Sequence, residues 1–83
     1  MEKNFIIEID HIHWNCGDGC CFDDWFNIDV MTCDGHTVLE WDECKFNDKE
    51  HAQEFAVKEL GNHFCDLIIT MDEIDIKHDE DWG

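Results

Sequence analysis

Two Asp-Gly dipeptides, at residues 18–19 and 34–35, constrain the fold of this chain more than any other feature of its sequence. Each lies between runs of residues typical of β-strands, and Asp-Gly in that setting is a strong signal for a two-residue hairpin turn. Placing both turns fixes the register of three consecutive antiparallel strands. In this register Ile9 faces Ile28, and Ile28 in turn faces Trp41.

The hydrophobic pattern tests this register, because a shift of one residue moves every side chain to the other face of the sheet. One face of the predicted three-stranded meander carries the following apolar side chains: Phe5, Ile7, Ile9, Phe22, Phe26, Ile28, Val30, Leu39 and Trp41. Two turns placed independently therefore agree on one buried face. We predict that this face packs against the rest of the domain.

A helix is predicted over residues 48–60, because Asn47 can cap it with Glu50 at the third helical position and Gly61 suits the position after its end. Its apolar face consists of Ala52, Phe55, Ala56 and Leu60. A fourth, kinked strand is predicted over residues 64–76. The fold class is therefore α+β: a two-layer βββαβ domain over residues 1–77, with an acidic flexible tail over residues 78–83.

Charge restricts the partners that this chain can have. It holds 22 acidic residues against five lysines and arginines, for a net charge of −17. A small soluble domain usually has a net charge of magnitude about 2–8. Such an excess disfavours direct binding to nucleic acid or anionic membranes and favours basic protein surfaces. With no long apolar run and no signal peptide evident, we expect a cytoplasmic protein whose cysteines are mostly reduced.

The second face of the predicted meander is acidic. Glu8 lies opposite Asp29, and Asp29 lies opposite Glu40. The next row holds Asp10, Asn27 and Asp42, and apolar side chains flank the two rows: Ile12, Trp14 and Trp25 on one side, and Ile6, Met31 and Val38 on the other. Charge that steers a partner and aromatic residues that anchor it are typical of an interface. The alternative is a solvated face whose apolar residues are covered by the C-terminal tail.

The stretch at residues 11–25 combines histidines, cysteines and acids. In the predicted hairpin Cys16 and Cys21 face each other within reach of a disulfide. His13 and Cys20 point to the opposite face from Cys16, which is poor geometry for one tetrahedral metal site. We therefore predict no metal and no other cofactor. A zinc site made from His13, Cys16, Cys20 and Cys21 is the second hypothesis.

No enzyme motif is found in the sequence. It lacks a glycine-rich phosphate loop and an EF-hand calcium loop. A reactive cysteine needs electropositive surroundings, which a chain this acidic does not favour. We therefore predict a protein that is not an enzyme.

The small size and strong acidity resemble those of phage-encoded inhibitors that copy the charge of DNA, a resemblance of composition and not of motif. A lack of proline and arginine, with frequent Lys, Asn and Ile, also fits an AT-rich phage genome. The resemblance implies a protein that occupies a basic, nucleic-acid-binding surface of another protein, in the host cytoplasm if phage-encoded. We expect it to be a monomer or homodimer. Two alternatives are the zinc domain above and an acidic accessory subunit with an apolar docking face. The residues predicted to bind the partner are Glu8, Asp10, Asp29, Glu40, Asp42, Ile12, Trp14 and Trp25.

Overall fold

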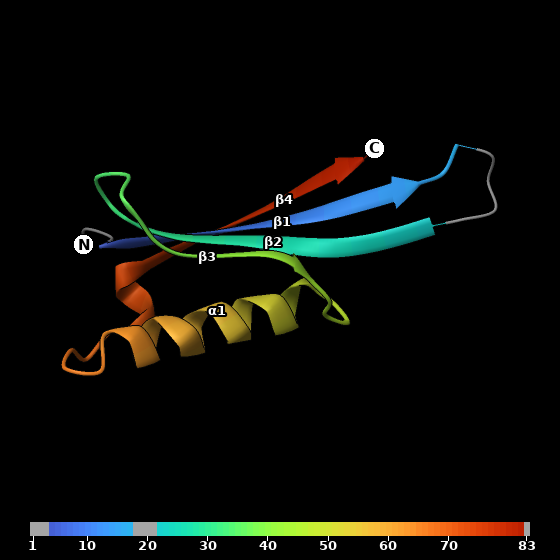
Figure 1. Cartoon of the computed structure of the whole chain (residues 1–83). Helices are drawn as coiled ribbons and strands as arrows, with labels where there is room; N and C mark the ends of the chain where they lie inside the picture. The colour runs from blue at the N-terminus through green and yellow to red at the C-terminus, as the bar shows by residue number, and fades with distance from the viewer. Residues whose placement is uncertain (1–3, 18–21, 83) are drawn as a thin grey trace.

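The computed structural model describes residues 4–17 and 22–82 of the chain. Its elements are β1 (Phe5–Asn15), β2 (Phe22–Thr32), β3 (Thr37–Cys44), α1 (Lys49–His63), a short 3-10 helix (Met71–Glu73) and β4 (Ile74–Trp82). The strands form one sheet in the order β3-β2-β1-β4, and α1 covers one face of it (Figure 1). We call this the inner face and the opposite one the outer face. The predicted α+β class, with the order βββαβ, is confirmed.

The register of the first hairpin is as predicted. Ile9 of β1 pairs with Ile28 of β2, and His11 pairs with Phe26. The turn predicted at residues 18–19 lies outside the described residues. The described ends of the strands, where Asn15 pairs with Phe22, nevertheless have the register that this turn requires.

The second hairpin reaches its predicted register by a different route. Gly35 N donates to Thr32 O at 3.0 Å, so residues 33–34 are the centre of the turn and not residues 34–35. Gly35 follows with a φ of 94°, a left-handed conformation that favours glycine. The turn thus shifts the pairing of β2 and β3 by one residue from the predicted register. A bulge at Val38, between the pairs Met31–Thr37 and Val30–Leu39, reverses this shift. Beyond this bulge Val30 pairs with Leu39, as predicted.

The core lies between the inner face of the sheet and α1. Its largest fully buried side chains come from both layers: Ile7, Ile9, Phe26, Ile28, Val30 and Leu60. Phe22, which was predicted to belong to this buried face, is 75% exposed. It lies in the end of the hairpin that extends beyond α1 (Figure 1), and we call residues 13–15 and 22–24 the hairpin arm. The predicted burial is therefore wrong for Phe22, because the helix does not reach the arm.

The helix differs from its prediction at both ends. Its N-cap is Asp48 and not Asn47, and the Asp48 carboxylate accepts a hydrogen bond from His51 N at 2.9 Å. This bond lowers the pKa of Asp48. At the other end the helix continues through Gly61 to His63, so Gly61 does not end it.

The fourth strand begins later than predicted and pairs in parallel with β1. A parallel neighbour requires a crossover that returns the chain to the starting end of β1. Residues 64–73 complete this crossover, and Phe64 packs on Phe5 with ring centroids 5.4 Å apart. The strand prediction at residues 64–76 is therefore wrong for its first part. Residues 78–82, predicted as tail, form the second half of β4.

Within residues 4–17 and 22–82, no helix is long and apolar enough to cross a membrane.

Candidate functional site

The acidic rows predicted for the outer face are assembled in the structure. Glu8 of β1 pairs with Asp29 of β2, and Asp29 pairs with Glu40 of β3. Asp10 pairs with Asn27 in the next row. Asp42 is close enough to Asp29 to affect its ionisation. The five carboxylates predicted to bind the partner therefore lie on one surface, built by alternation along three strands.

A β-bulge shapes one border of this surface. Between the pairs formed by Phe26 and Ile28 the register shifts, so that one residue of β2 faces two of β3. At the bulge Glu43 has a φ of 56°, in the left-handed region. Its backbone N–H donates to the side-chain oxygen of Asn27 at 3.0 Å. Asn27 therefore holds the bulge in place, a role that the sequence did not reveal.

The strand β4 extends the acidic surface beyond what was predicted. In its parallel register Asp79 pairs with Asp10, and Lys77 pairs with Glu8. Asp75 and Asp81 follow the same alternation. We define the acidic face by its carboxylates: Glu8, Asp10, Asp29, Glu40, Asp42, Asp75, Asp79 and Asp81. The β4 residues were missed because a parallel pairing between distant segments leaves no local signal in the sequence.

The pKa values of two half-buried carboxylates on this face are raised. Burial raises the pKa of Asp10, and the neighbouring charge of Asp79 raises it further, followed by that of Glu8. Burial likewise raises the pKa of Asp29, with a contribution from Asp42. Both shifts mean that the folded protein resists full ionisation at these positions. The acidic face therefore has an electrostatic cost in the free protein.

The apolar residues predicted to flank the acidic rows lie on the same surface. Ile12 pairs with Trp25, and both are half-buried. Trp14 lies further out on the hairpin arm and is 46% exposed. Lys45 Nζ lies 5.6 Å from the ring centroid of Trp25. The alternative, in which a C-terminal tail covers these residues, is not supported by the part of the chain that the structure describes, because residues 78–82 belong to β4 at the edge of the sheet.

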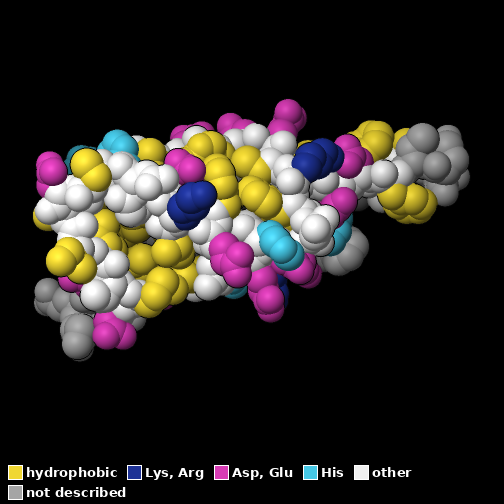
Figure 2. All heavy atoms as spheres, turned by 90° about the horizontal axis from the view of Figure 1, so that it is seen from below, with side chains coloured by type: hydrophobic (Ala, Val, Ile, Leu, Met, Phe, Trp, Pro, Cys, Tyr) yellow, Lys and Arg dark blue, Asp and Glu magenta, His cyan; other side chains and the backbone are white. Residues whose placement is uncertain are grey.

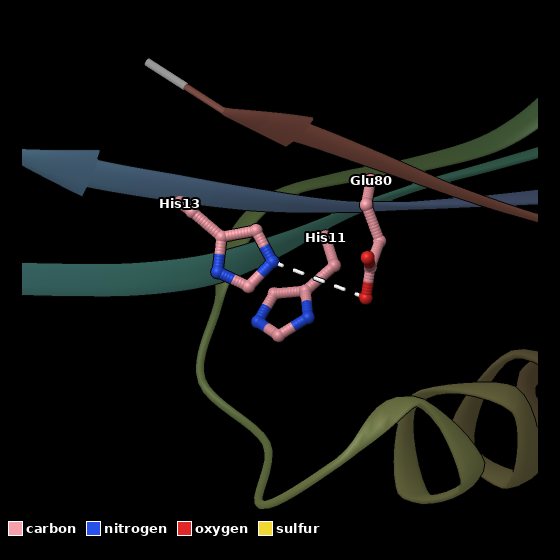
Figure 3. A group of neighbouring side chains, drawn as sticks. All are labelled: His11, His13 and Glu80. Atoms are coloured by element: carbon pink, nitrogen blue, oxygen red, sulfur yellow. Dashed lines mark ion pairs between the residues drawn. The ribbon is translucent and has the colours of Figure 1, made fainter.

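A second group of polar residues lies on the inner face, next to α1. His11 pairs with Glu80 in the register of β1 and β4, and His13 follows two residues later (Figure 3). The ligand atoms of these three side chains all lie within 4.8 Å of one another. His13 Nε2 is 4.0 Å from the Glu80 carboxylate. We call these three residues the histidine cluster.

Aromatic and acidic neighbours hold His11 in place. Its ring stacks on Phe26 at a centroid distance of 4.2 Å, with an interplanar angle of 16°. Its Nε2 is 2.7 Å from a carboxylate oxygen of Asp24. The rings of His11 and His13 are themselves 4.0 Å apart between centroids. Beside the cluster is a hollow of about 380 Å³, lined by Ile9, His11, Lys49, His78, Asp79 and Glu80.

The structure describes only two of the four ligands in the hypothesis of a cysteine-containing zinc site. His13 is on the inner face, as predicted, and Cys16 lies exposed just beyond the end of β1. Cys20 and Cys21 lie outside the described residues, and so does the predicted pairing of Cys21 with Cys16. Elsewhere burial raises the pKa of the Cys44 thiol, and the charge of Asp42 adds to this effect.

Comparison with protein-family models, with curated proteins and with solved structures finds no match for this chain. The functional argument therefore depends on the two surfaces described above. The acidic face offers charge over four strands of one sheet. The histidine cluster brings two imidazole groups and one carboxylate close together.

Proposed function

We propose that this protein is a stoichiometric binding protein whose acidic face occupies a basic surface of another protein. The observation that carries the proposal is the acidic face itself. Its carboxylates extend over all four strands. Among the described residues, Lys77 is the cation that lies in the same rows as these carboxylates. Acids needed for solubility alone could be scattered, whereas these are gathered by strand register on one side of the sheet.

The energetics favour a partner that supplies cations. Neighbouring strands lie about 4.8 Å apart, and two unit charges at this separation repel by a little under 1 kcal/mol in water. The raised pKa values of Asp10 and Asp29 reflect burial first and this repulsion second. Arginine or lysine side chains from a partner would be attracted to these carboxylates and would offset the repulsion between them. Arginine can bind a carboxylate through two parallel hydrogen bonds.

A surface that otherwise binds nucleic acid is the partner of best-matched chemistry. Such surfaces present clustered lysine and arginine to a regular array of phosphates. A sheet with rows of carboxylates would compete for the same cations, so the protein would act as a nucleic-acid mimic and an inhibitor. A phage-encoded inhibitor of a host or defence protein, acting in the host cytoplasm, is the biological class that fits this chemistry.

Apolar residues beside the acidic face would contribute binding energy that does not depend on salt concentration. Trp25 and Ile12 border the carboxylate rows, and Trp14 is exposed on the hairpin arm. Aromatic residues are common among the few residues that dominate binding energy at interfaces. The acidic face would therefore set the association rate, and these three residues would slow dissociation.

The first test captures the partner and varies the salt concentration. The immobilised protein is incubated with bacterial lysate, and the captured proteins are identified and purified. We expect a basic protein whose affinity falls steeply between about 50 and 500 mM salt, as the screening length decreases from roughly 14 to 4 Å. Its cognate DNA or RNA should compete for binding. Affinity that is indifferent to salt would exclude charge mimicry.

The second test locates the contact with charge-matched variants. Asp29→Lys/Glu40→Lys reverses two charges in the acidic face, and Glu54→Lys/Asp66→Lys makes the same change in net charge at exposed positions of α1 and the turn after it. We expect the first variant to weaken binding at least about tenfold more than the second, because local complementarity matters more than net charge. Equal losses in the two variants would show that the acidic face is not the contact.

A further inference from the structure

The proposed binding function leaves the histidine cluster on the inner face without a role. We infer that His11, His13 and Glu80 form a binding site for a divalent transition-metal ion, with zinc as the ion of best-matched chemistry. This inference is independent of the acidic face, which lies on the other side of the sheet. Figure 2 shows the molecule from the helix side, where hydrophobic, acidic and histidine side chains all reach the surface.

Strand geometry brings the three ligands together. His11 and His13 are two residues apart in β1, so alternation places both on the inner face. The parallel register puts Glu80 of β4 beside His11. With zinc bonds of about 2.0–2.2 Å, ligand atoms in a tetrahedral site are roughly 3.3 Å apart. The present separations of up to 4.8 Å are therefore closed by small side-chain rotations.

The ligands differ in how firmly they are held. The side chains of His11 and His13 are only 21% and 22% exposed, and His11 is fixed by its stacking on Phe26. The Glu80 side chain is 57% exposed, so it can move toward an ion. Two firmly placed imidazoles and one adjustable carboxylate are sufficient to hold a metal ion with little reorganisation of the fold.

Asp24 completes the arrangement from the second strand of the hairpin. Its carboxylate is 2.7 Å from His11 Nε2, which leaves His11 Nδ1 on the side of the ring that faces Glu80 (Figure 3). A carboxylate on the far nitrogen of a metal-binding histidine fixes the tautomer and makes the ligand more basic. Asp24 is thus a positioning residue for the site and not a ligand.

The donor types select the class of ion. Imidazole nitrogen suits zinc, copper and nickel, whereas magnesium and calcium prefer oxygen ligands. Three protein ligands leave at least one coordination position for water or a small ligand. The hollow of about 380 Å³ beside His11 and Glu80 gives that ligand room.

The site also avoids the difficulty of the cysteine-containing hypothesis. There the predicted register divides the ligands between two faces of the hairpin, whereas all residues of the histidine cluster and Asp24 lie on the inner face. Only His13 is common to the two ligand sets. The two sites can therefore be separated by mutation.

Zinc binding is tested by calorimetric titration of the full chain, with a reductant and excess Mg²⁺ present to occupy the exposed carboxylates. We expect one zinc ion per chain. His13→Gln and Glu80→Gln should each weaken binding at least about tenfold, and Asp24→Asn by about 10–100-fold. His36→Gln, at an exposed histidine in the second hairpin, and Glu54→Gln should bind zinc like the unaltered protein.

A variant that is altered at all three hairpin cysteines, Cys16→Ser/Cys20→Ser/Cys21→Ser, should keep its zinc ion. If it loses the ion while Glu80→Gln keeps it, the inference is wrong. Zinc binding that excess Mg²⁺ abolishes would also overturn it, since the ion would then be held by carboxylates alone.

Nuclear magnetic resonance of the unaltered protein provides a readout that does not depend on whether a variant folds. One equivalent of zinc should shift the imidazole signals of His11 and His13 and leave those of His36 and His63 in place. Equal shifts at all of these histidines would contradict a defined site.

Discussion

Asp10 in β1 and Asp79 in β4 are register partners on neighbouring parallel strands, so two carboxylates lie side by side on the outer face. The charge of Asp79 is the largest electrostatic contribution to the raised pKa of Asp10, after burial. A fold that placed these residues at random would rarely bring them together. The acidic face is therefore a local feature of the sheet and not only a result of the net charge.

Removing one of these two charges should stabilise the protein. We predict that Asp79→Asn increases the free energy of unfolding at neutral pH by some tenths of a kcal/mol, up to about 1 kcal/mol. Asp66→Asn removes the same charge from the exposed turn after α1 and serves as the control. Urea unfolding measures both variants. An equal gain in the control would mean that net charge, and not the pairing with Asp10, determines the effect.

The pH dependence of stability should reveal the two half-buried carboxylates. The pKa values of Asp10 and Asp29 are raised in the folded protein, so ionisation at these groups opposes folding once the pH exceeds the unfolded value of about 3.8. We predict that Asp10→Asn/Asp29→Asn is more stable than the unaltered protein at about pH 7, and that this difference shrinks as the pH falls toward about 4. Urea unfolding across this range checks it. A difference that grows on acidification would contradict the raised pKa values.

The core assignment predicts a sharp contrast between two large apolar residues. Leu60 in α1 is fully buried, whereas Phe22 on the hairpin arm is mostly exposed. Leu60→Ala should reduce the free energy of unfolding by about 2–5 kcal/mol, and Phe22→Ala should change it by less than about 0.5 kcal/mol. Thermal melts followed by circular dichroism distinguish these outcomes. Similar losses in the two variants would mean that the arm is packed in solution.

The bulge in β3 offers a stabilising substitution. Glu43 has a φ of 56°, a conformation that costs a residue with a side chain roughly 1–2 kcal/mol. Glu43→Gly should remove this cost, partly offset by the greater entropy of glycine in the unfolded chain, for a net gain of up to about 1 kcal/mol. Glu43→Gln removes the charge but keeps the strained conformation. If the glutamine variant is as stable as the glycine variant in urea, charge and not backbone strain explains the gain.

Local signals in the sequence predict the meander well. The Asp-Gly dipeptides and the alternation of residues such as Ile7 and Ile28 fix one register, and the structure has that register even though its second turn is built differently. The bulge at Val38 was not predictable, because it corrects for a turn conformation that Asp34 and Gly35 alone do not specify. The acidic rows of β1, β2 and β3 follow from the same register.

The placement of β4 could not be predicted in the same way. Residues 64–70 contain a short apolar run typical of a strand, yet they serve a crossover in which Phe64 packs on Phe5. The true strand contains His78 and Glu80 in an acidic segment that resembles a solvated tail. Both the extension of the acidic face and the carboxylate of the histidine cluster come from this strand, so the sequence revealed only part of each site.

The position of β4 at the edge of the sheet also affects how the protein behaves when it is concentrated. An edge strand exposes backbone hydrogen-bonding groups to which a strand of another molecule can add, and charged side chains are a common defence against such growth. On β4 the side chains of Asp79, Glu80 and Asp81 project to both faces, so two copies joined edge to edge would bring carboxylates together above and below the shared sheet. The crowding that weakens the isolated fold should therefore also oppose polymerisation at this open edge, and this protection should weaken in acid, where carboxylates become neutral.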